Sequence, residues 1–219
     1  MFRIVSIISF IAAFTGIGLC CIVRPCCKEC RWTPLAVIRR IIRIFTMLLL
    51  EQKLSPAGAL RKLVSLLALL CFLVLAITSF YPVLVLGESI HGYWLMLHAT
   101  FAPVFAICLA VLAVMCAGSR RFNKNDWPWL THIIERVTLV KSSSEDAVAE
   151  SIGLGQKITF WLIAILTLPL ILSIILSMFK FFGTYWQELL LDIHRWTALA
   201  FALAAIIHIY IIIRAKMKE

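Results

Sequence analysis

Three histidines lie within strongly apolar stretches of this 219-residue chain. His194 and His208 stand fourteen residues apart in HRWTALAFALAAIIH, and His98 lies in HGYWLMLHATFAPVF, seven residues after His91. An imidazole in an apolar segment is costly, and such residues usually face a bundle interior or a functional site. Fourteen residues are almost four helical turns, so His194 and His208 share one helix face, separated by about 21 Å along its axis.

This separation fits two haems held at different membrane depths by one helix. Bis-histidine iron has both axial positions filled by protein, which suits electron transfer. Copper or zinc would need ligands that cluster more closely than these histidines do. A histidine that only packs and forms hydrogen bonds is the alternative for each position.

The elements that position these histidines must span a membrane. Of all residues, 63% are hydrophobic and only 15% are charged, which is a membrane composition. A spanning helix needs about 20 mostly apolar residues. The sequence therefore predicts an all-α integral membrane protein with five transmembrane helices, at residues 4–23, 63–86, 93–117, 158–179 and 189–213.

The basic residues predict the orientation of these spans. Of 21 lysines and arginines, 18 lie in residues 24–62, in residues 120–157 or after residue 213, and the rest are Arg3, Lys180 and Arg195. Basic residues near membrane ends gather on the cytoplasmic side. We therefore expect a bacterial inner-membrane protein with its N-terminus outside and its C-terminus cytoplasmic. The net charge of +10 reflects this topology, and no nucleic-acid partner is expected.

The chain divides into two predicted parts. Residues 1–60 are expected to form an uncleaved transmembrane anchor and a cytoplasmic amphipathic segment, in which arginines alternate with apolar residues at helical spacing. Residues 61–219 are expected to form a four-helix membrane domain. The stretch SPAG at residues 55–58 is expected to break the chain before the second span begins at Arg61 and Lys62.

Five of the eight cysteines cluster after the first span. They are Cys20, Cys21, Cys26, Cys27 and Cys30. The C-x2-C pair of Cys27 and Cys30 has the spacing of metal or thiol-exchange sites. Its predicted cytoplasmic location favours plain reduced thiols. The chain has no C-x-x-C-H motif, which excludes covalently attached c-type haem.

The stretch HRWTALAFALAAIIH resembles the last core helix of the membrane-bound b-type cytochromes. These include the cytochrome b subunits of formate dehydrogenase, thiosulfate reductase and nickel-iron hydrogenase, and bacterial cytochrome b561. The resemblance implies a four-helix haem-binding core over residues 63–213. It implies His194 as the outer-haem ligand and His208 as the inner-haem ligand, with His98, or its rival His91, completing the outer site. Arg195 follows His194 and is expected to reach a haem propionate.

One ligand that the resemblance implies is missing. The family usually takes the second inner-haem ligand from the start of the first core helix, but RKLVSLLALLCFLVLAITSF contains no histidine. His132 is one candidate partner for His208. A ligand that is not histidine, a residue of a partner subunit, or the lack of an inner haem would also account for the gap. One haem b is therefore expected, and two are the alternative.

The leading functional hypothesis is a membrane cytochrome b subunit. It would pass electrons between the quinone pool and a periplasmic or membrane redox subunit of a larger complex, through bis-histidine haem b. Glu88, His91 and Tyr93 stand where quinol protons would leave on the outer side. Two competing hypotheses are a haem-free structural membrane subunit and, less favoured, a thiol–disulfide oxidoreductase that works through Cys27 and Cys30.

Overall fold

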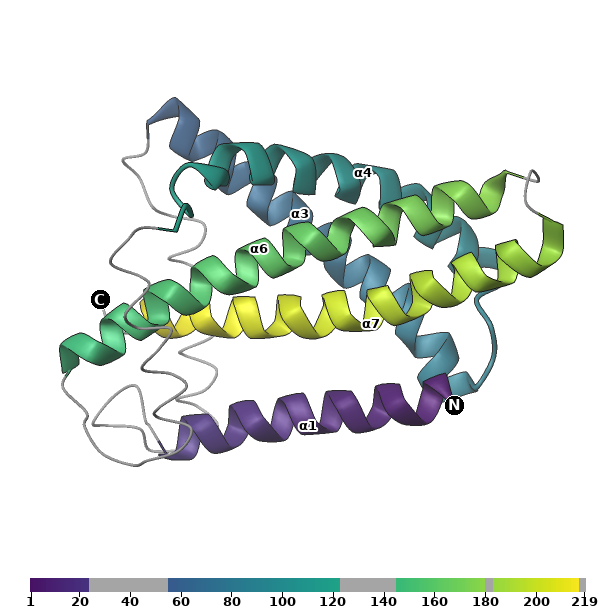
Figure 1. The fold of residues 1–219 in the computed structure, drawn as a ribbon, viewed down its shortest axis with the longest axis horizontal. Helices are drawn as coiled ribbons and strands as arrows, with labels where there is room; N and C mark the ends of the chain where they lie inside the picture. The colour runs from purple at the N-terminus through teal and green to yellow at the C-terminus, as the bar shows by residue number, and fades with distance from the viewer. Residues whose placement is uncertain (24–54, 123–144, 180–182, 217–219) are drawn as a thin grey trace.

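The described part of the chain is entirely helical. A computed structural model describes residues 1–23, 55–122, 145–179 and 183–216 (Figure 1). Its elements are α1 (Phe2–Val23), α3 (Pro56–Tyr81), the short π-helix η1 (Pro82–Leu86), α4 (Gly92–Ala117), α6 (Glu145–Met178) and α7 (Gly183–Lys216). Five helical segments of this part are long and apolar enough to cross a membrane, which confirms the predicted fold class.

The helices form two hairpins with α1 at the side. Helix α3 packs closely against α4, and α6 packs closely against α7. The hairpins meet to form a four-helix bundle, and α1 lies beside α7 (Figure 1). The two chain termini lie at opposite ends of the bundle. We call these the N-terminal end and the C-terminal end of the bundle.

The start of α3 differs from the sequence expectation. Ser55 is its N-cap, because the side-chain oxygen accepts a hydrogen bond of 3.3 Å from the backbone N–H of Gly58, and Pro56 occupies the first turn. Serine at the N-cap and proline just inside the helix both favour a helix start. The SPAG stretch therefore begins α3 rather than breaking the chain ahead of Arg61.

The N-terminal end of α1 is hydrogen-bonded to η1, which directly follows α3. The Arg3 guanidinium donates hydrogen bonds of 3.2 Å from Nε and 3.0 Å from Nη2 to the carbonyl oxygen of Leu84, within η1. Gly87 ends η1 with a φ of +77° and lies against the Arg3 guanidinium. Carbonyl groups at a helix end lack intrahelical partners. Arg3 therefore satisfies one of these groups and holds α1 against the bundle.

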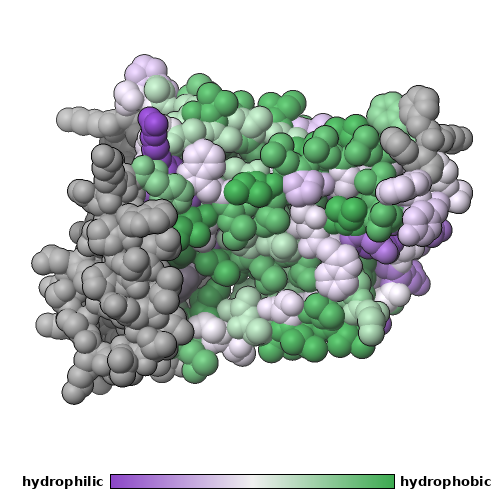
Figure 2. All heavy atoms as spheres, in the orientation of Figure 1, coloured by the Kyte–Doolittle hydropathy of each residue, from purple (hydrophilic) through white to green (hydrophobic). Residues whose placement is uncertain are grey.

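Aromatic packing fills the middle of the bundle. The ring of Phe201 on α7 lies 6.3 Å from that of Phe72 on α3 and 5.8 Å from that of Phe105 on α4, between centroids. Small buried residues surround this cluster, namely Ala68, Cys71, Cys108 and Ala205. On the face that Figure 2 shows, hydrophobic side chains cover the middle of the bundle, and hydrophilic ones lie nearer its ends. The surface suits a lipid environment, and the core is held together by close packing.

Truncating Phe201 to alanine is expected to destabilise the bundle by about 3 kcal/mol, because it leaves a cavity among packed rings. Phe201→Leu should cost less, since leucine refills part of the space. The thermal unfolding midpoint of the purified protein in detergent measures both effects. Phe14→Ala is the control, because Phe14 is 60% exposed on α1. An equal decrease of the unfolding midpoint in the control variant would show that the aromatic cluster stabilises the bundle no more than an exposed ring does.

Candidate functional site

His98 on α4 is held by hydroxyl groups of α3. Its Nδ1 lies 3.1 Å from Oγ1 of Thr78 and 3.2 Å from Oγ of Ser79. The Thr78 hydroxyl is buried and donates its own proton to the carbonyl of Val74, at 2.8 Å. Its oxygen is therefore left to accept, so Nδ1 of His98 carries the proton and donates. Nε2 then holds the lone pair that a metal requires.

His194 on α7 is held by α6 in the same manner. Its Nδ1 lies 2.9 Å from the carbonyl oxygen of Leu170 and 3.4 Å from the hydroxyl oxygen of Ser173. A carbonyl oxygen only accepts, so Nδ1 must carry the proton and donate it. The Ser173 hydroxyl is buried and donates to the same carbonyl, at 3.1 Å. Nε2 of His194 is again the nitrogen with a lone pair.

His98 on α4 and His194 on α7 lie at the same depth, because Phe105 and Phe201, each seven residues further along its helix, are in ring contact at 5.8 Å between centroids. We call this depth the first level and treat the two imidazoles as one candidate site. No group of three or more histidine, cysteine or acidic side chains gathers among the described residues, so they hold no cluster of the zinc type. Two oriented imidazoles from opposite helices are the donor set of a bis-histidine haem.

His208 marks a second level, fourteen residues further along α7. Its Nδ1 lies 2.7 Å from Oγ1 of Thr159 on α6, and that hydroxyl donates to the carbonyl of Gly155 at 2.8 Å. Nδ1 of His208 therefore carries the proton and donates it, as in His98 and His194, and Nε2 keeps its lone pair. Arg120 at the end of α4 interacts with it electrostatically and donates to Oε1 of Gln156, at 2.6 Å.

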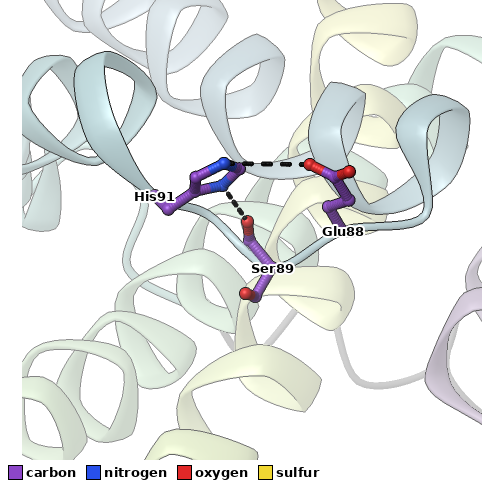
Figure 3. Close-up of polar contacts among 3 residues, drawn as sticks. All are labelled: Glu88, Ser89 and His91. Atoms are coloured by element: carbon purple, nitrogen blue, oxygen red, sulfur yellow. Dashed lines mark hydrogen bonds and ion pairs between the residues drawn. The ribbon is translucent and has the colours of Figure 1, made fainter.

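His91 lies apart from these two levels. It is the N-cap of α4 in an extended conformation, with its side chain 67% exposed. Nδ1 lies 2.8 Å from the carbonyl oxygen of Ser89, and Nε2 lies 3.8 Å from a carboxylate oxygen of Glu88 (Figure 3). Arg195 is also exposed and pairs with Asp192 at 3.2 Å. The structure therefore brings His98, and not His91, to His194.

The hydroxyl partners of the histidines did not emerge from sequence reasoning. The hydroxyl partners are Thr78, Ser79, Thr159 and Ser173, and at the second level Arg120 donates to the amide oxygen of Gln156. The available signal was the presence of hydroxyl residues in otherwise apolar spans at the depth of each histidine. His132, Lys180, Cys26, Cys27 and Cys30 lie outside the described residues. Cys20 accepts a hydrogen bond of 3.0 Å from Nη1 of Arg214.

Removing both hydroxyl partners of His98 is expected to change the populations of its two neutral tautomers. In the metal-free protein, Thr78→Val with Ser79→Ala should increase the share of the Nε2–H form of His98, because both hydroxyl partners are lost and, among the described residues, only the backbone carbonyl of Leu75 remains to accept from Nδ1. Nitrogen-15 chemical shifts of the labelled imidazole report the two tautomers separately. The signal of His208 serves as the internal control, since Thr159 is untouched. An unchanged His98 spectrum would show that the two hydroxyl groups do not set its tautomer.

Comparison with protein families identifies a match over the core helices. The family model described as prokaryotic cytochrome b561 matches residues 65–218, which is well over half of the chain. The matched region contains α4, α6, α7 and α3 from Ser65 onward, and therefore every histidine of the two levels. No curated protein and no solved structure matches the chain.

Proposed function

The chain belongs to the prokaryotic cytochrome b561 family and is a membrane b-type cytochrome of electron transfer, and from this premise we propose that His98 and His194 hold one haem b. One observation carries the proposal. Both imidazoles donate through Nδ1 to fixed acceptors on the neighbouring helix, so their Nε2 lone pairs are ready to bind iron. Partners of this kind fix ring orientation and raise the basicity of a ligand.

The residues around the first level have distinct roles in this proposal. Bound haem would supply reversible one-electron transfer, and His98 and His194 would hold its iron through Nε2. Thr78 and the carbonyl of Leu170 hold the rings in place. Arg195 directly follows His194, and its exposed guanidinium is available for a propionate once it leaves Asp192. His208 is the ligand proposed for the second level.

The charge of the described residues supports an orientation in the membrane. Basic side chains gather near the C-terminal end of the bundle, namely Arg61, Lys62, Arg120, Arg121, Lys157 and Arg214. Arg3 and Arg195 are the described basic residues of the other end. Because basic residues concentrate on the cytoplasmic side, we place the C-terminal end in the cytoplasm of a bacterium and the first level near the outer face.

A quinone is the proposed electron carrier on the membrane side, and a periplasmic or membrane redox subunit is the proposed partner. The first level lies near the outer face in this orientation, so electrons would reach the partner over a short distance. Glu88 and His91 form an exposed pair in the loop at the same face. Their carboxylate and imidazole are suited to accept quinol protons and release them to water. The partner covers this face in the proposal.

Loss of either first-level histidine is expected to abolish haem binding. His98→Ala and His194→Ala should each remove the b-type signal, because one imidazole alone leaves an axial position of iron open. A pyridine haemochrome assay and a reduced-minus-oxidised spectrum measure haem per chain. His91→Ala is the matched control and should keep its haem, since His91 contacts Glu88 and Ser89 instead. Retention of haem in His194→Ala would refute the proposed site.

Glu88→Gln is expected to slow haem reduction by a water-soluble quinol analogue several-fold, without loss of haem. The amide keeps the shape of the side chain and removes its ability to take a proton. Stopped-flow absorbance of the protein in liposomes measures the rate. Glu188→Gln is the control, because Glu188 is an acidic residue near the same end of the bundle, on α7. Equal slowing in both variants would argue against a specific role for Glu88.

A further inference from the structure

The second level contains one oriented imidazole and no matching partner among the described residues. We infer that it is a half-site: His208 is positioned as a ligand, and the inner face of α3 presents Val64 where a second ligand would have to stand. The inference rests on the proposed haem site at the first level. It explains why the chain would bind a single bis-histidine haem, and it predicts that one substitution on α3 raises the number of haems per chain.

The depth of each residue follows from equal steps along packed helices. Thr78 and Ser79 of α3 contact His98 at the first level. Fourteen residues from His194 lead along α7 to His208, and fourteen residues from Thr78 and Ser79 lead back along α3 to Val64 and Ser65. Both steps cover about 21 Å in the same direction, because the two helices run antiparallel. Val64 and Ser65 therefore lie at the level of His208.

Neither residue offers iron a strong ligand. Val64 is partly buried and packs against the core cluster of Ala68, Cys71 and Phe201, so its side chain lies on the inner face of α3. Ser65 is exposed, away from the core, and its hydroxyl donates to the carbonyl of Arg61 at 2.7 Å. Bis-imidazole ligation from α3 would need a nitrogen on the inner face, at the position of Val64. The chain has an isopropyl group there.

The other core helices do not replace the missing ligand. Leu112 of α4 stands fourteen residues beyond His98 and packs against the same core. Cys108 and Cys116 lie four residues to either side of Leu112, about 6 Å away along the axis. Thr159 of α6 is already bonded to Nδ1 of His208. Arg120 is near His208, but a guanidinium has no lone pair to offer.

The two levels share what α6 and α7 contribute and differ in what α3 and α4 present. At both of them an imidazole of α7 donates through Nδ1 to an acceptor on α6, which is Leu170 at the first level and Thr159 at the second. At the first level α4 adds His98, which α3 supports with two hydroxyl groups. At the second level the inner faces of α3 and α4 present Val64 and Leu112. An imidazole placed on α3 at this depth would complete the site.

The test adds a histidine to the full-length protein and counts haems. Val64→His is expressed, and the pyridine haemochrome assay gives haem per chain. We expect one haem in the unmodified protein and in His208→Ala, and an increase toward two in Val64→His. Combining that variant with His208→Ala should return the content to one. Near-infrared magnetic circular dichroism reports whether the added haem is bis-histidine ligated.

Leu63→His is the matched control. Leu63 neighbours Val64, but it is 65% exposed on the outer face of α3, so its variant should keep one haem. The first-level haem, retained at one per chain, reports that each variant has folded.

Three results would overturn the half-site. They are two haems in the unmodified protein, loss of haem in His208→Ala, or no gain in Val64→His. Retention of haem in His194→Ala would instead overturn the proposed function, so the two failures are distinguishable.

Discussion

An imidazole in the interior of a membrane bundle needs an acceptor for its N–H, because neither lipid nor apolar side chains can supply one. Each hairpin of the core meets this need in the same way. A histidine on the second helix donates to a hydroxyl or carbonyl oxygen on the first: His98 to Thr78, His194 to Leu170 and His208 to Thr159. One set of bonds therefore joins the helices of each hairpin and leaves Nε2 of each ring with its lone pair. The hydrogen bonds that join the helices therefore also orient the histidines for metal binding.

Between the two levels the bundle is filled mainly by apolar packing. Phe201 stands seven residues from His194 and seven from His208, and it contacts Phe72 and Phe105. The rings fill the centre of the core, and small residues beside them let the helices approach closely. Thr167 of α6 also lies between the levels, and its hydroxyl is satisfied within its own helix by the carbonyl of Ile163. The distance between the levels therefore depends on a largely apolar, closely packed spacer.

Helix α1 takes no part in either level, yet contacts at both of its ends attach it to the bundle. Arg3 bonds to the carbonyl of Leu84 at one end, and Cys20 accepts a hydrogen bond from Arg214 at the other. Phe2 also packs edge-on against Trp196 of α7. Most of the helix between these points faces outward. The four-helix core carries the function, and α1 is an addition to its side.

Sequence alone determined the features that depend on local composition and helical periodicity. The apolar length of each span, the shared face of His194 and His208, and the family resemblance all follow from residue type and spacing, and the fold class is confirmed. Spacing did not separate His98 from His91, because seven residues return to nearly the same helix face. Tertiary structure separates them: α4 begins only after His91, which turns to Glu88, while His98 meets Thr78 on another helix. The same holds for Thr159 and Val64, since the residue opposite a histidine is set by how helices pack, and no local pattern encodes that register.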